Sequence, residues 1–152
     1  IPYDGDPNYA SQTGYEMDII YSSLGEMDAK SVTVFLDACF SGANRNNEML
    51  LADARPVFLE IDNTMVGNVN VFAAAGSKEI SSAWPEKKHG LFSYYLMKGM
   101  RGDADSNKDQ KITYGELGDY IKENVSDRAG MLDREQTPSL RTRDRDKVFL
   151  KY

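Results

Sequence analysis

Two residues of this chain have side chains suited to nucleophilic and acid–base catalysis, its single cysteine, Cys39, and its single histidine, His89. A cysteine thiolate attacks acyl groups, and such catalysis requires a base that removes the thiol proton. Cys39 follows the apolar run 32–36, which predicts a strand buried on both faces, and Ser41-Gly42 after it permits a sharp turn. We therefore expect Cys39 at the carboxyl edge of a sheet, where open α/β folds bind ligands.

Spacing alone leaves two interpretations of Cys39 and of its neighbour Asp37. A free cysteine is commonly a small buried apolar side chain rather than a nucleophile. Asp37 stands two residues before Cys39, and residues two apart on a strand point to the same face, so its carboxylate is placed to line a substrate pocket. A carboxylate at a strand end also commonly accepts hydrogen bonds from nearby backbone groups. Both pairs of alternatives stay open at this point.

A second pattern predicts a cation site. Residues 105–116 fit the twelve-residue calcium loop of the EF-hand, in which oxygen donors converge on one Ca²⁺. The expected ligands are the side chains of Asp105, Asn107, Asp109 and Glu116 and the main-chain carbonyl of Lys111. Gln110 stands where the sharp turn favours glycine, and no paired second loop is visible. Thr113 and Glu116 also form a capping-box pattern, which opens a helix without any metal.

The hydrophobic pattern predicts the elements that position these residues. The predicted strands cover residues 32–38, 69–75 and 148–150. The predicted helices cover residues 15–27 and 90–100 and a segment that begins at Thr113. Residues 1–14 and 126–146 are expected to be loops, because they combine Gly, Pro and polar or charged residues without a sustained period.

The string Asp37-Ala-Cys39-Phe-Ser-Gly after a hydrophobic strand resembles the nucleophile motif of the caspase-like cysteine peptidases of clan CD. These include metacaspases, clostripain-like enzymes and bacterial caspase homologues. The metacaspase form is Asp-x-Cys-His-Ser-Gly, and here Phe40 replaces the His that follows the Cys. The resemblance extends to residues 1–6, 72–77, 89–94 and 136–138, and so covers most of the chain.

The resemblance implies a three-layer α/β sandwich around a mostly parallel sheet, without the family's N-terminal strands. Residues 1–55 would form the end of the large-subunit half, and residues 56–152 the small-subunit half with the EF-hand-like loop. In the family the region between the two halves is often cleaved. Arg45 and Arg55 are therefore candidate self-processing sites, or else solvated arginines of a plain surface loop.

The resemblance also implies covalent acyl transfer. Cys39 would attack the scissile carbonyl, and its backbone N–H would contribute to the oxyanion hole. Asp37 would receive a Lys or Arg side chain of the peptide substrate, so cleavage after basic residues is expected. Ser77, Ser82 and Trp84 would form the wall of the substrate pocket. A loop tryptophan beside a proline is otherwise a capping apolar side chain.

The catalytic base is expected to come from outside this chain. In the caspase-like family the histidine lies upstream of the cysteine, in a His-Gly pair whose glycine also supplies an oxyanion N–H. His89 matches another position, before a helix, and is expected to be structural. Ile1 falls just downstream of where that His-Gly pair would end. We therefore expect either that an N-terminal light chain carries the histidine or that the histidine has been deleted. A catalytically inactive homologue acting as an interaction module, and a calcium-binding module with Cys39 buried, are the alternatives.

Composition sets broad limits on the function. The chain has 152 residues, 41% of them hydrophobic and 28% charged, which predicts one globular domain. Its net charge of −6 argues against nucleic acid, which requires a cluster of Lys and Arg. The one basic concentration, residues 141–147, is interleaved with Asp144 and Asp146. No stretch approaches the roughly 20 apolar residues of a membrane span. One cysteine excludes an internal disulfide, so the compartment is unknown.

Overall fold

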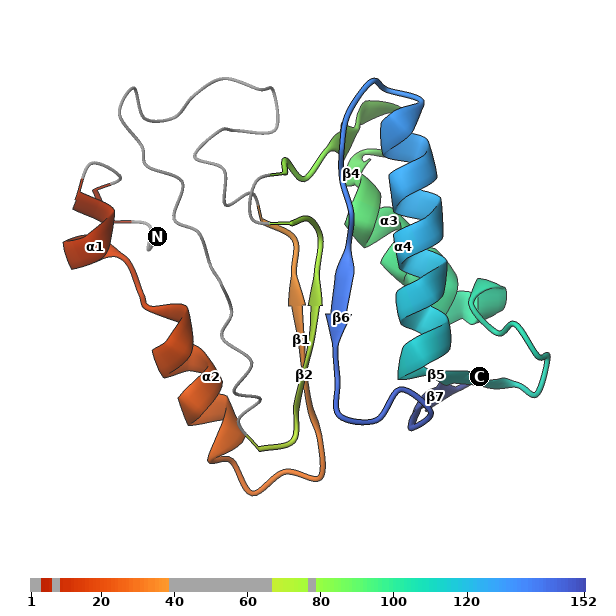
Figure 1. Cartoon of the computed structure of the whole chain (residues 1–152), viewed down its shortest axis with the longest axis horizontal. Helices are drawn as coiled ribbons and strands as arrows, with labels where there is room; N and C mark the ends of the chain where they lie inside the picture. Colours follow the sequence, from red (N-terminus) through yellow and green to blue (C-terminus); the bar gives the residue numbers. More distant parts are fainter. Residues whose placement is uncertain (1–3, 7–8, 39–66, 77–78) are drawn as a thin grey trace.

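The computed structural model of the protein describes residues 4–6, 9–38, 67–76 and 79–152. In these residues helices pack on both faces of a small sheet, so the fold is mixed α/β (Figure 1). The strands are β1 (Val32–Leu36), β2 (Val69–Ala73), β3 (Ala83–Trp84), β4 (His89–Gly90), β5 (Lys111–Thr113), β6 (Ser139–Arg141) and β7 (Val148–Lys151). The helices are α1 (Ala10–Thr13), α2 (Met17–Gly25), α3 (Leu91–Lys98) and α4 (Tyr114–Gly130), with the 3₁₀ turn η2 (Pro85–Lys87) and the π-helical turn η3 (Gly99–Asp103).

The main sheet has the strand order β1-β2-β6. Strands β1 and β2 are parallel, with Val32 opposite Val69 and Leu36 opposite Ala73, so their carboxyl ends meet at one edge. Strand β6 pairs with β2 in the antiparallel direction. Two small antiparallel pairs, β3-β4 and β5-β7, complete the described strands. The strands predicted at 32–38 and 69–75 are present, each two residues shorter than expected. Burial of the whole strand is confirmed for β2, but the prediction of a strand buried on both faces was wrong for β1, which is only partly buried and exposes Phe35.

Alternation along β1 and β2 divides the core into two parts. Val32, Val34 and Leu36 of β1, with the alternate valines of β2, pack against α2 on one face. A strand presents successive side chains to opposite faces, so the residues between them must face the other helices. There Phe72 of β2 stacks on Phe35 at 5.2 Å between ring centroids and belongs to the larger core.

The larger core lies between the sheet and helices α3 and α4. Helix α4 buries Leu117, Ile121 and Val125 at helical spacing, as predicted from the sequence. It begins with a complete capping box, in which Thr113 Oγ1 accepts from Glu116 N and Glu116 Oε2 accepts from Thr113 N. None of the described helices is long and apolar enough to cross a bilayer.

The prediction of a loop over residues 126–146 was wrong at both of its ends. Helix α4 continues to Gly130, because its buried stripe extends through Ala129. Residues 139–141 form β6, where Leu140 lies opposite Phe72. Three residues are too few to show an alternating pattern, and pairing with β2 decides their structure. Strand β7 was predicted, but it pairs with β5 rather than closing the main sheet.

Candidate functional site

Several of the sequence-predicted site residues lie outside the described residues. They are Cys39, Ser77, Arg45 and Arg55. The structure describes the other predicted pocket residues, Asp37, Ser82 and Trp84, and all five predicted cation ligands. Asp37 directly follows β1 at the carboxyl edge that β1 shares with β2. Its position at this edge is the one expected from the sequence.

Two serines from distant parts of the chain bind the carboxylate of Asp37. Ser81 Oγ donates a hydrogen bond to Oδ1 at 2.6 Å, and Ser93 Oγ donates one to Oδ2 at 2.5 Å. Ser81 precedes β3, and Ser93 lies in the first turn of α3. Three segments of the chain therefore meet at one half-buried carboxylate. No local pattern in the sequence indicates that Ser81 or Ser93 would bind Asp37.

Gly90 leaves the space that this carboxylate occupies. A Cβ atom on Gly90 would lie 2.7 Å from Asp37 Oδ2, which is closer than real contacts allow. Gly90 is also the N-cap residue of α3 and has no side chain to cap it. Asp37 thus brings a carboxylate to the positive end of α3, where a capping side chain would otherwise stand. This arrangement suits either a helix-stabilising carboxylate or an acidic pocket.

Gln136 links the segments beside this carboxylate. Its side chain is 1% exposed, its Oε1 accepts a hydrogen bond from Ser82 N at 2.8 Å, and its Nε2 donates to the Ala74 carbonyl at 2.9 Å. Glu79 Oε2 adds a second link, since it accepts from the backbone N–H groups of Gly76 and Thr137. Ala74 N still donates to the Leu36 carbonyl at 2.8 Å, and beyond that backbone hydrogen bond the main chain after β2 is held by these side chains.

Ser82 and Trp84 contribute to this region in different ways. Ser82 is fully buried, and its Oγ makes no hydrogen bond within the described part of the chain, so it contributes mainly through its backbone. Trp84 is half-buried in β3 and contacts the ring of Tyr94 at 4.9 Å between centroids. His89 is exposed in β4, opposite Trp84 in the register of the strand pair.

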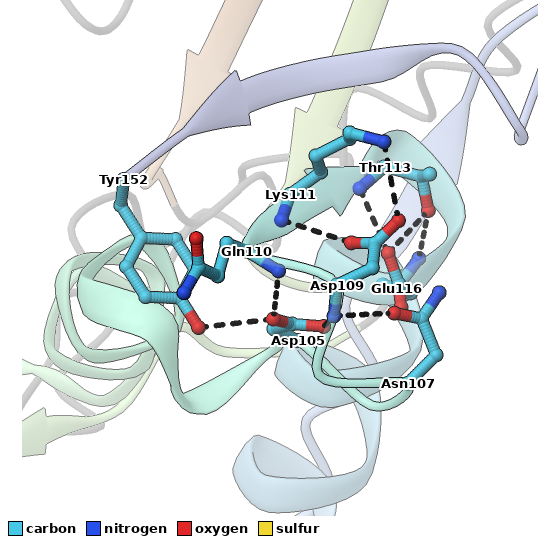
Figure 2. A network of polar contacts seen from close by, with 8 residues as sticks. All are labelled: Asp105, Asn107, Asp109, Gln110, Lys111, Thr113, Glu116 and Tyr152. Atoms are coloured by element: carbon cyan, nitrogen blue, oxygen red, sulfur yellow. Dashed lines mark hydrogen bonds and ion pairs between the residues drawn. The ribbon is translucent and has the colours of Figure 1, made fainter.

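The five expected cation ligands lie between η3 and the first turn of α4, with Lys111 in β5 and Glu116 in α4, and Figure 2 shows this segment from close by. Asp105 accepts from the backbone N–H of Gln110 at 2.9 Å, and Asn107 Oδ1 accepts from Asp109 N at 2.9 Å. Gln110 has a φ of 63°, so the residue that replaces the expected glycine adopts the left-handed conformation that favours glycine. The loop therefore has the sharp turn that an EF-hand requires at this position.

The second half of this loop pairs with the C-terminal strand. Ile112 in β5 lies opposite Leu150 in β7, so β7 takes the place of the missing second loop. The hydroxyl of Tyr152 donates to Asp105 Oδ2 at 3.0 Å (Figure 2). Lys111 Nζ lies 3.6 Å from Asp109 Oδ2, and its positive charge partly neutralises that carboxylate.

Hydrogen bonds make two of the loop carboxylates more acidic. Burial alone would raise the pKa of Asp105, but hydrogen bonds from Gln110, Tyr152 and Asp109 outweigh it and lower the pKa. The pKa of Glu116 is lowered in the same way, because burial is outweighed by hydrogen bonds from Thr113 and Ser106. The hydrogen bond to Asp105 raises the pKa of the Tyr152 hydroxyl. Both carboxylates are thus favoured in their ionised form, in which they can act as anionic oxygen donors.

The donor set of this loop differs from that of a transition-metal site. The described residues contain no group of three or more His, Cys, Asp or Glu side chains gathered to hold a metal ion, and the loop carboxylates Asp105, Asp109 and Glu116 are therefore not gathered in that way. An EF-hand also uses an amide and a backbone carbonyl, here from Asn107 and Lys111, and all of its donors are oxygens. The chemistry of the donors therefore fits a hard cation such as Ca²⁺.

No family model, curated protein or solved structure matches this chain.

Proposed function

We propose that this chain is the cysteine-bearing part of a caspase-like endopeptidase that cleaves peptides after Lys or Arg. The observation that carries the proposal is the position of the Asp37 carboxylate. It lies at the carboxyl edge of two parallel strands, two residues before Cys39, and it is bound by serines from two other segments. A ligand at this edge is typical of open α/β folds. A carboxylate there would select a basic side chain through a charge-assisted hydrogen bond.

In the proposed reaction Cys39 is the nucleophile. Its thiolate sulfur bonds to the carbonyl carbon of the Lys or Arg residue, and the peptide C–N bond then breaks. The base that removed the thiol proton returns a proton to the leaving amine. Water then attacks the thioester, which releases the acid product and restores the thiol. The backbone N–H of Cys39 would stabilise the oxyanion in both steps.

The base is proposed to be a histidine on an N-terminal light chain or upstream segment. The order of the described sheet supports this proposal, since β1 is its end strand, and a parallel strand added beside β1 would end at the same edge as Asp37. The catalytic histidine of the caspase-like family, if it stood at the end of such a strand, would lie near the residues that follow β1.

Co-expression of this chain with the upstream segment tests the proposal. We expect cleavage of fluorogenic peptides that end in Lys or Arg, no cleavage of those that end in Asp, and no activity in the Cys39→Ala variant. Cys39 in the wild type should also be alkylated rapidly by iodoacetamide, because the thiolate and not the thiol is the nucleophile. An unreactive Cys39 and no cleavage would instead favour the inactive homologue acting as an interaction module. Activity of the chain alone would make His89 the candidate base.

We also propose that loop 105–116 binds Ca²⁺ in a structural role. Asp105, Asn107, Asp109 and Glu116 would hold the ion with their side chains and Lys111 with its carbonyl, and the ion would offset the negative charge of the loop. The left-handed backbone at Gln110 supports this proposal independently of the ligand types. A capped helix alone does not require that turn.

Calcium is expected to raise the melting temperature of the protein, and Glu116→Gln is expected to remove most of that rise. Glutamine keeps the capping-box pattern but loses the charged bidentate ligand. Calcium at about 100 times its Kd would add about 2.7 kcal/mol to the free energy of unfolding. Differential scanning fluorimetry with Ca²⁺, Mg²⁺ and chelator measures the shift. Glu123→Gln, at an exposed position of α4, is the control. An unchanged melting temperature at about 10 mM Ca²⁺, above the Kd of weak EF-hand sites, would contradict the proposal.

A further inference from the structure

We propose that Lys87 and Arg128 form a subsite for an acidic side chain of the peptide substrate, beside the pocket of Asp37. That the ligand is a substrate rests on the proposed function. The chemistry of the subsite rests on the geometry around Trp84. The proposed substrates therefore carry a basic residue at the cleaved bond and an acidic residue close to it in sequence.

Both cations of the subsite contact the ring of Trp84. The guanidinium carbon of Arg128 lies 4.5 Å from the ring centroid, and Lys87 Nζ lies 5.8 Å from it. Lys87 Nζ also lies 5.7 Å from the ring centroid of Tyr94, which contacts Trp84 edge to face. Arg128 comes from α4 and Lys87 from the turn after β3, so two separate elements bring positive charge to the Trp84 ring.

Neither cation has a carboxylate partner in the described part of the chain. Other cations there do, for example Lys98 with Asp103 at 3.0 Å and Arg145 with Asp119 at 2.6 Å. The one hydrogen bond of the Arg128 guanidinium there is a weak one from Nη1 to Met131 Sδ at 3.9 Å, and its Nε is buried without an acceptor. A guanidinium has five N–H donors, and leaving donors unpaired is costly.

The absence of such a partner among the described residues is notable in an acidic chain. The sequence has 24 Asp and Glu residues against 18 Lys and Arg. The neighbours Glu86 and Asp127 are exposed, yet they form no ion pair with Lys87 or Arg128. An aromatic ring attracts the cations and holds them in place, but it accepts no strong hydrogen bond. A carboxylate from a ligand would supply the acceptor that these cations do not find in the described ranges of the chain.

The subsite lies next to Asp37 along two chain segments. Ala83, directly before Trp84, pairs in register with Gly90, which contacts the Asp37 carboxylate. On α3 the residue directly before Tyr94 is Ser93, which donates a hydrogen bond to that carboxylate. Successive residues of an extended peptide are about 3.4 Å apart, so the subsite would select an acidic residue a few positions before the cleaved bond.

Intrinsic fluorescence tests the subsite directly, because Trp84 is the only tryptophan of this chain. The protein would be the Cys39→Ala variant with its upstream segment, in a form of that segment without tryptophan. The probes are acetylated peptide amides that end in Lys, with either Glu or Gln placed two, three or four positions before it. We expect the best Glu peptide to change the fluorescence of Trp84 and to bind about fivefold more tightly than its Gln counterpart.

Matched variants assign that preference to the two cations. The double variant Lys87→Gln with Arg128→Gln should bind Glu and Gln peptides equally, while Arg128→Lys should keep part of the preference because it keeps the charge. Lys122→Gln removes one charge from an exposed position of the same helix and should leave the preference unchanged. A merely structural Arg128 would affect stability in these variants without affecting the Glu-to-Gln ratio. Equal binding of all Glu and Gln pairs by the Cys39→Ala protein would overturn the inference.

Cleavage assays separate a failure of this inference from a failure of the proposed function. If the protein cleaves after Lys or Arg and no Glu in the peptide increases the rate of cleavage, the proposed peptidase function stands and the subsite is overturned. If Glu peptides bind more tightly than Gln peptides but no peptide is cleaved, the subsite stands as a peptide-binding site and the proposed peptidase function is overturned. Loss of the binding preference at high salt is also expected, since both cations are at least partly exposed.

Discussion

Replacing Asp37 by asparagine is expected to lower kcat/KM for Lys- and Arg-terminated peptides by about 100-fold, while the protein stays folded. Asparagine has nearly the same shape, and the hydroxyls of Ser81 and Ser93 can rotate to bond its amide. The substitution removes the negative charge that the basic side chain of the substrate would meet. A hydrogen bond to a charged group is worth up to about 3 kcal/mol, which corresponds to a factor of about 100.

Steady-state kinetics of the reconstituted enzyme and circular dichroism measure the two parts of this prediction. Asp119→Asn is the matched control, because it removes one charge from an exposed carboxylate that pairs with Arg145 on the surface. If Asp37→Asn unfolds the protein, or leaves the preference for Lys and Arg unchanged, Asp37 is a structural carboxylate at the start of α3. The acidic pocket would then have to be sought elsewhere.

Replacing Gln136 by leucine is expected to lower the free energy of unfolding by about 3 kcal/mol. Leucine fills a similar volume but makes no hydrogen bonds, so Ser82 N loses its acceptor and the Ala74 carbonyl loses a donor in the interior. Each unsatisfied buried group costs about 1–3 kcal/mol. Because Ser82 belongs to the segment beside Asp37, the same change should also raise KM for basic peptides.

Urea denaturation of the wild type and the variant measures the stability change. The control is Glu135→Leu, at the exposed neighbouring position, which should change the free energy of unfolding by less than about 0.5 kcal/mol. A decrease of less than about 1 kcal/mol for Gln136→Leu would show that water or a shifted backbone replaces both hydrogen bonds. Gln136 would then not hold the segment after β2 in place.

The two central strands, the three main helices and the capping box could be predicted from the sequence. Strand β1 consists of continuous apolar or β-branched residues, β2 does so apart from Asn70, and α2, α3 and α4 repeat apolar residues at helical spacing. Asp37 could be placed at the sheet edge for the same reason, because it directly ends the first of these runs. The turn at Gln110 was expected from the spacing of the EF-hand pattern, but not from its residue type, which disfavours the left-handed backbone conformation that Gln110 adopts.

Tertiary structure alone decided which side chains surround Asp37 and how the C-terminal strands pair. The sequence separation is 44 residues between Asp37 and Ser81, 56 between Asp37 and Ser93, and 62 between Gln136 and Ala74. Local patterns report which face of a strand or helix is buried, but not which distant side chain will meet a given polar group. Strand β6 shows the same limit, because its three residues become a strand only by pairing with β2. Periodicity therefore determined the elements, and long-range hydrogen bonding and packing determined the site.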